Sequence, residues 1–280
     1  MLGTVAQVMA LTAYGNATLQ RADSIPGPAF YPGNSAFQFC EYVRFVDVIG
    51  SGPSTQLQEW APDPIAWFDR LRIERVATLR LRYGPQGGGT VGGERVPDRM
   101  LAGFLGGGGR WLIEALSPDG SDYWEARWQA GDRNRPDQKI WRVTYGRIAR
   151  GQITHTLAPE NLEQLKRELD RTLTELEHCA RSHRLASFAT LFERSRAQLF
   201  AASPGGDVYH TDLTVPGQLS QLAEQLLAAA QLGWVFGGMG SWNDVGFDVS
   251  KDPEYQRLSD TLFTLLPRTY VAVADTTMRR

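Results

Sequence analysis

The chain changes from predicted strands to predicted helices at THTLAPENLEQLKRELDRTLTELEHCARSHRL, residues 154–185. Within this stretch leucines recur at steps of three and four residues, and Glu, Lys and Arg fill most positions between them. This spacing places the leucines on one face of a helix and predicts an amphipathic α-helix. Pro159 and Glu160 suit its start, because proline is tolerated in a first helical turn and an acid favours the positive end of the helix dipole. The leucines are Leu162, Leu165, Leu169, Leu173 and Leu176.

Before this stretch, three segments alternate apolar and polar residues, as strands with one buried face do. They are RWLIEAL (110–116), YWEARWQ (123–129) and IWRVTYGRI (140–148), and turn-forming residues separate them. We therefore expect an antiparallel meander with one face lined by tryptophan. The tryptophans concerned are Trp111, Trp124, Trp128 and Trp141.

The beginning of the chain also predicts strands. Residues 5–19 are expected to form one or two strands around a turn at Gly15 and Asn16. The run that starts at Ala36 is rich in aromatic and β-branched residues and alternates with period two.

Two other segments of this half differ from strands. Asp63 is suited to the N-cap of a helix and Pro64 to its first position, so a helix is expected after them. Residues 84–98, GPQGGGTVGGERVPD, are expected to form a mobile hairpin loop or an interdomain linker, because glycine loses much entropy on folding and offers no side chain to pack.

Three more helices are expected after residue 185. The first is LASFATLFERSRAQLFA (185–201), and the second begins near Pro216 and is ended by Gly237 and its neighbouring glycine. The third has Asp252 as its N-cap and is expected to end at Pro267.

The fold class that follows is α+β, because strands and helices are segregated along the chain and do not alternate. We expect a β-rich domain at residues 1–156 and a helical domain of about four helices at residues 157–280.

The net charge, the apolar stretches and the cysteines of the chain argue against some classes of protein. The 280 residues carry a formal net charge of −2, so a broad basic surface for nucleic acid is not expected. The most apolar helical stretch, residues 219–236, contains polar residues that do not suit a membrane span. The two cysteines, Cys40 and Cys179, have no CxxC partner, and the chain start is a poor signal peptide. The basic residues are nearly all Arg, which supports a bacterial origin, and the isolated cysteines favour a reducing compartment, so we expect a bacterial, cytoplasmic protein.

The stretch WVFGGMGSWNDVGFD, residues 234–248, is the most unusual local pattern. It lacks the Lys of a phosphate-binding P-loop, the third Gly of a dinucleotide fingerprint and the second Gly of a nucleophile elbow. Gly237 and Gly238 are suited to the positive φ that ends a helix. Ser241 and Asp244 have the spacing of a capping box. The stretch therefore predicts a turn between two helices.

The same turn could present acidic and aromatic groups to another protein, with charge steering the encounter and a buried indole supplying affinity. A basic surface on that protein would suit such a loop. The predicted partner-binding residues are Met239, Ser241, Trp242, Asn243, Asp244 and Asp248.

No catalytic template is recognised, and no cofactor or metal is expected. An alternative is a metal-assisted hydrolase that uses Asp244, Asp248 and a histidine such as His210. Cys179 and His183 are also four residues apart, as a helical metal pair would be, although a pair alone is not a site. A third possibility is a structural subunit of a larger assembly, which would self-associate.

Residues 236–244, FGGMGSWND, resemble a motif of uncharacterised bacterial proteins. Those proteins carry Gly-Gly-Met-Gly-Ser-x-Asn-Asp between two C-terminal helices, and some resemble the immunity partners of secreted bacterial toxins. The resemblance covers about the last quarter of the chain. It implies a cytosolic protein that binds another protein, such as a basic toxin domain, and catalyses nothing, and it supplies no catalytic residues.

Overall fold

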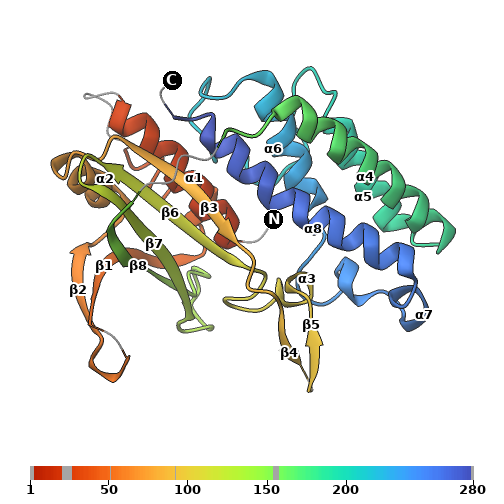
Figure 1. Ribbon diagram of the computed structural model, residues 1–280, viewed down its shortest axis with the longest axis horizontal. Coiled ribbons are helices and arrows are strands. Elements are labelled where there is room, and N and C mark those ends of the chain that lie inside the picture. Colours follow the sequence, from red (N-terminus) through yellow and green to blue (C-terminus); the bar gives the residue numbers. More distant parts are fainter. Residues whose placement is uncertain (1–2, 21–26, 51, 92, 154–157, 279–280) are drawn as a thin grey trace.

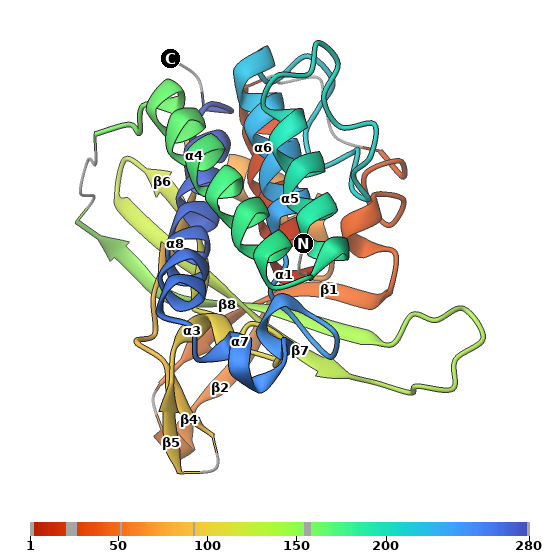
Figure 2. The ribbon, with the colours of Figure 1, turned by 90° about the vertical axis from the view of Figure 1, so that its right-hand side faces the viewer.

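The computed structural model describes residues 3–20, 27–50, 52–91, 93–153 and 158–278. A six-stranded sheet lies in the N-terminal half and is covered on one face by helices, as Figure 2 shows. The predicted α+β class is confirmed. The strands of this sheet are β1 (Cys40–Ile49), β2 (Gln56–Ala61), β3 (Thr78–Gly84), β6 (Arg110–Ser117), β7 (Gly120–Ala130) and β8 (Trp141–Gln152).

The described residues contain eight α-helices, where one was expected after Pro64 and about four in the C-terminal half. The three unexpected helices are two in the N-terminal half and a very short one before the last. The helices are α1 (Gly3–Gln20), α2 (Pro64–Ile73), α3 (Asp98–Leu101), α4 (Leu162–Ser182), α5 (Ala186–Gln198), α6 (Gln221–Gly233), α7 (Phe247–Ser250) and α8 (Pro253–Asp275). Short 3-10 turns are η1 (Ser35–Phe37), η2 (Gly52–Ser54) and η3 (Trp242–Asp244).

The sheet is mixed, whereas an antiparallel one was expected. Its strand order is β2-β1-β8-β7-β6-β3, and β6, β7 and β8 are antiparallel neighbours. The parallel pair is β1 and β8, with Phe45 opposite Tyr145. Alternating apolar residues indicate which face of a strand is buried, but they do not indicate which strand lies beside it. That is why the parallel pair could not be predicted.

Two of the four strand tryptophans are buried on the helix-covered face. Trp124 is fully buried and Trp111 nearly so, whereas Trp128 and Trp141 are only partly buried. Trp124 packs edge-on against Trp67 of α2, with ring centroids 5.6 Å apart. A single face lined by all four tryptophans stays a prediction.

The expected strands at residues 5–19 are wrong, because this segment is helix α1. The helix lies between the sheet and the C-terminal helices (Figure 1) and is apolar on nearly all sides, so it lacks the polar face that would reveal a helical period. Asn16, toward its C-terminal end, pairs with the backbone of β3: Nδ2 donates to the Leu79 carbonyl at 2.9 Å, and Oδ1 accepts from the Leu79 N–H at 2.7 Å.

Helices α2 and α4 confirm their predictions. Asp63 caps α2 by accepting from the Ala66 N–H at 2.9 Å, and Pro64 occupies its first position. Leu165, Leu169, Leu173 and Leu176 of α4 are all fully buried.

Two expected helix ends are wrong. Helix α6 ends at Gly233, before the glycine pair at 237 and 238. Helix α8 continues through Pro267 to Asp275, although an interior proline removes a hydrogen bond and costs about 3 kcal/mol. The buried residues beyond Pro267 offset that cost, among them the fully buried Tyr270.

The Gly-rich segment at 84–98 forms a hairpin, one of the two structures expected for it. It contains a two-stranded hairpin of β4 (Gly89–Val91) and β5 (Glu94–Val96). The Asp98 carboxylate accepts from the backbone N–H groups of Gln86 and Gly88, each at 2.8 Å. These bonds order a segment whose glycines alone would favour disorder.

One hydrophobic core contains residues from both sides of position 156. It includes Val8 and Leu11 of α1, Leu81 of β3, and Leu262 and Tyr270 of α8. Helix α1 therefore shares a core with helices that come last in the chain.

Candidate functional site

The loop between α6 and α8 has the local structure that its sequence predicts. The Ser241 hydroxyl accepts from the Asn243 N–H at 3.3 Å, and Asp244 Oδ2 accepts from the Ser241 N–H at 3.2 Å. These bonds form the predicted capping box around η3. The expectation about glycine is wrong in detail: of the described glycines at 237, 238 and 240, only Gly240 has a positive φ, of 79°.

Trp242 does not face outward, so the prediction that its indole is presented to a partner is wrong. The side chain is 0% exposed and packs edge-on against Phe188 and Phe192, with ring centroids 5.1 and 5.0 Å away. Its Nε1 donates to Ser259 Oγ at 2.8 Å, and the Tyr255 hydroxyl donates to its backbone carbonyl. Burial of such a large ring stabilises the folded state, provided that its N–H finds a hydrogen-bond acceptor.

Asn243 is also buried, and it pairs with Arg99 of α3. Asn243 Nδ2 donates to the Arg99 carbonyl at 2.7 Å, and Arg99 Nη1 donates to Asn243 Oδ1 at 3.1 Å. Arg99 is only 2% exposed; its Nε donates to Asp260 at 2.7 Å and its Nη2 donates to Gln256. This buried cation joins α3, η3 and α8, and its partners compensate the cost of removing the charge from water.

The remaining predicted residues lie at or near the surface. Met239 is fully exposed, Asp244 and Asp248 are exposed, and Ser241 is half-buried. The structure therefore separates the predicted set into a buried pair, Trp242 and Asn243, and four residues that another molecule could reach.

A second segment brings further apolar residues to the same place. Gly103 lies so close to the loop that a Cβ there would be 2.4 Å from the Gly237 carbonyl oxygen. Phe104 and Leu105, which follow it, are 65% and 60% exposed. We call Phe104, Leu105 and Met239 the exposed apolar patch. Phe104 and Leu105 were not among the predicted site residues, although two large apolar residues between glycines, in GFLGGGG (103–109), were a usable signal.

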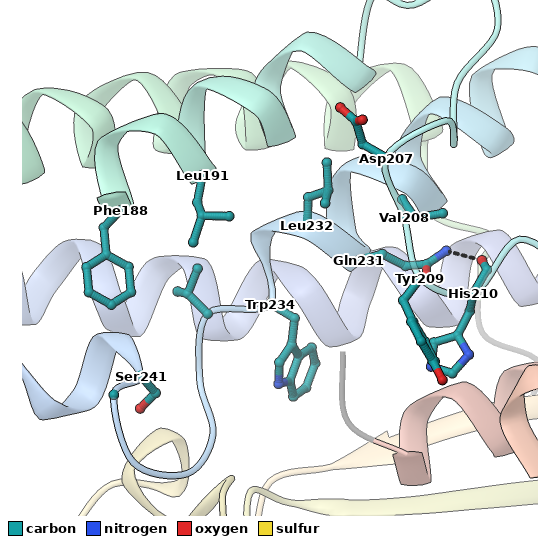
Figure 3. Close-up of a pocket in the computed structure, with 12 residues that line it drawn as sticks. Phe188, Leu191, Asp207, Val208, Tyr209, His210, Gln231, Leu232, Trp234 and Ser241 are labelled. Carbon is teal, nitrogen blue, oxygen red and sulfur yellow. Dashed lines mark hydrogen bonds between the residues drawn. The ribbon is translucent and has the colours of Figure 1, made fainter. Parts of the chain in front are cut away.

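Beside the loop lies a hollow of about 430 Å³, shown in Figure 3. Its walls come from α5, α6 and the segments around residues 208 and 241, with Ser241 and His210 at opposite ends of the view and Trp234 between them. We call it the α5–α6 hollow. It is lined by Phe188, Leu191, Asp207, Val208, Tyr209, His210, Gln231, Leu232, Trp234, Val235, Gly240 and Ser241.

His210 belongs to a Ser-His-Asp cluster that the sequence did not predict. Ser35 Oγ lies 2.7 Å from His210 Nδ1 and donates to an oxygen of the Asp212 carboxylate, while the Ser35 N–H donates to its other oxygen at 2.8 Å. An ionised carboxylate only accepts, so the Ser35 oxygen is left to accept from Nδ1–H of a neutral imidazole. Burial lowers the pKa of His210 to about 4, against the opposing effect of Asp212.

This arrangement does not activate the serine. A nucleophilic serine gives its proton to an imidazole that a carboxylate orients, whereas here the imidazole donates and the serine gives its proton to the carboxylate. The cluster instead fastens η1 to the loop that contains His210 and Asp212.

The residues of the metal-hydrolase alternative are not brought together. The described part of the chain contains no group of three or more His, Cys, Asp or Glu side chains that could hold a metal ion. His183 Nε2 is hydrogen-bonded to Asp252 Oδ2, at a distance of 2.9 Å. Cys179 has a buried thiol, and burial raises its pKa to about 11. That alternative gains no support.

Comparison with known proteins gives no match to a protein-family model, a curated protein or a solved structure. None of the helices in the described ranges has both the length and the apolar character needed to cross a membrane.

Proposed function

We propose that the protein binds another protein without catalysing a reaction, as an immunity-type inhibitor of a bacterial toxin would. The observation that carries the proposal is the exposed apolar patch. Large apolar side chains are costly to leave in water, and several of them on neighbouring surface segments are typical of a protein interface.

The segments that carry the exposed apolar patch are held in place by contacts with other elements. Arg99 ties α3 to η3 and α8, and the backbone of Gly103 rests against that of Gly237. A preorganised surface loses less entropy on binding, which favours a stable complex.

The acidic groups near the patch support a basic partner. Asp244 and Asp248 are exposed, and Asp207 stands at the α5–α6 hollow with its side chain 53% exposed. Exposed acids raise the association rate with a basic surface and add little to affinity by themselves. The buried, unpaired cysteines, Cys40 and Cys179, support the cytoplasm as the place of action.

Affinity purification from the native cell, compared between matched variants, tests the proposal. The partner should be captured by the wild type and lost with Phe104→Ser, Leu105→Ser and Met239→Ser combined. It should be retained with Ile73→Ser on α2, which removes an equally exposed apolar side chain, 79% exposed, outside the patch. An inhibitor should also restore growth to cells that express the captured partner.

A partner that binds the patch variant as well as the wild type would contradict this surface. A captured protein whose expression is harmless would contradict the immunity role and leave the binding role standing.

A further inference from the structure

We infer that the α5–α6 hollow receives an arginine side chain of the partner protein; the inference rests on the proposed function. Met239 of the exposed apolar patch is followed directly by Gly240 and Ser241, which line the hollow, so a protein that binds Met239 lies beside the hollow. A volume of about 430 Å³ is within the range of ligand-binding pockets, and it can hold a long side chain with part of the segment that carries it.

The charges around the hollow favour a cation. Asp207 is the one carboxylate among the described residues that line it, and no lysine or arginine lines it. Arg194 lies 3.5 Å from Asp207, but both side chains are about half exposed, so this ion pair is weak and leaves the carboxylate available.

The polar atoms at the His210 end of the hollow are acceptors. Because Nδ1 of His210 donates to Ser35, its Nε2 carries a free lone pair. Gln231 Nε2 donates to the His210 carbonyl at 3.1 Å, which leaves Gln231 Oε1 as an acceptor. No described residue donates to either His210 Nε2 or Gln231 Oε1. Both side chains are more than nine-tenths buried, so their positions are fixed before a ligand arrives.

The walls between the two ends are apolar. Leu191 and Leu232 can cover the aliphatic stem of a long side chain. The nearly buried Trp234, packed against Phe263 and Tyr270, forms a fixed part of the wall. A guanidinium combines five donors, a positive charge and a flat face that stacks on aromatic rings. Of the natural side chains, arginine has the length, the positive charge and the number of donors that suit a lining of acceptors and one carboxylate, and lysine has fewer donors.

Titration with N-acetyl-L-arginine amide, followed by the imidazole NMR signals of His210, tests the inference on the whole chain. N-acetyl-L-citrulline amide is the matched probe, because it keeps the shape and loses the charge. The arginine amide should shift the His210 signals and saturate, and the citrulline amide should bind about tenfold more weakly, as expected for loss of a charge-assisted hydrogen bond.

The variant Asp207→Asn should bind the arginine amide about two- to fivefold more weakly, which is the effect of losing one exposed ion pair. Asp248→Asn, an exposed acid that does not line the hollow, should leave it unchanged. Equal binding of both amides, or no saturable shift at the solubility limit of the arginine amide, overturns the inference.

Failure of this inference differs from failure of the proposed function. If the partner needs the patch but the arginine amide does not bind, the partner does not use the hollow and the proposed function stands. If the arginine amide binds but no partner depends on the patch, the proposed function fails and the hollow is no longer a partner site.

Discussion

Trp242 and Met239 are three residues apart in the loop after α6, yet they have opposite surroundings. Trp242 is fully buried against two phenylalanines, and Met239 is fully exposed. Replacement of Trp242 by Ala should therefore act on folding: we expect a loss of about 3–5 kcal/mol in the free energy of unfolding, measured by urea denaturation. Met239→Ala is the matched control and should change stability by less than about 0.5 kcal/mol. A Trp242→Ala protein as stable as the wild type would contradict the burial of the ring.

Asn243 is the neutral partner that Arg99 needs inside the protein. Asn243→Ala leaves the Arg99 carbonyl and one guanidinium N–H without their bonds, at a cost of about 1–3 kcal/mol. Urea denaturation checks this value, with Asp248→Ala as an exposed control in the next turn of chain. The same stability in both variants would show that water replaces the lost bonds.

His210 makes stability depend on pH in a defined window. Its pKa is lowered by burial from 6.5 in a free histidine to about 4, so the unfolded chain binds the proton more readily than the folded one. The contribution of the neutral ring is fully present above pH 6.5 and is lost as the pH falls toward 4, by up to about 3 kcal/mol. His210→Asn keeps a donor for Ser35 and does not titrate. The free energy of unfolding of this variant should fall less over the same window, and parallel curves would exclude the histidine as the cause.

At the scale of elements, the sequence predicted α4 and missed α1 for one physical reason. Helix α4 has one face on the core and one in water, so its leucines stand out against charged residues. Helix α1 is covered on nearly all sides, and its Val and Thr residues are equally typical of strands. A period becomes visible only when burial differs between the faces of an element.

Gly15 of α1 allows that helix to lie close to β3. A Cβ at this position would be 2.3 Å from Leu79 Cδ1 and 2.9 Å from Phe68 Cε1, both in fully buried side chains. In an exposed helix Gly→Ala would stabilise by about 1 kcal/mol, but here overpacking should reverse the sign and destabilise by about 1–3 kcal/mol. Thermal unfolding measures the change.

The matched control for Gly15→Ala is Gly3→Ala in the same helix. Its Cβ would meet Trp128 at an ordinary contact distance of 3.5 Å, so it should be neutral or slightly stabilising. A stabilised Gly15→Ala protein would mean that α1 and β3 are not so closely packed.

The candidate site likewise combines contacts between residues that are close in sequence with contacts between residues that are far apart in sequence. The capping box of Ser241 and Asp244 depends on residues three apart, and the sequence predicted it. The burial of Trp242, the bond of Asn243 to Arg99 and the contact of Ser35 with His210 join residues far apart in sequence. A single sequence shows residue types and their local spacing. It therefore predicted the loop, but it did not predict which of the side chains in the loop face water.

At the scale of the whole molecule, contacts between the start of the chain and its last third join the strand-rich half to the helical half. Asn16 of α1 donates to Thr277 Oγ1 at 2.8 Å, and Gln218 donates to the Ala13 carbonyl at 2.8 Å. On the other side of the molecule, Arg99 is held by Asp260 of α8. Contacts at both ends of the sheet therefore tie the two predicted domains into one core (Figure 1).

We expect that neither half folds alone. A chain of residues 1–156 would expose the faces of α1 and β3 that pack on α8, and residues 157–280 would expose the matching face of α8, so each would lose the burial that offsets its chain entropy. Each half expressed separately should give narrow amide NMR dispersion, and the intact chain should unfold in one transition seen equally by tryptophan fluorescence and circular dichroism. The two halves expressed together provide the control, because they should recover the native spectrum if the shared core drives folding. A half that folds cooperatively on its own would show that the boundary near residue 156 separates independent domains, and the shared core would then be only an interface between them.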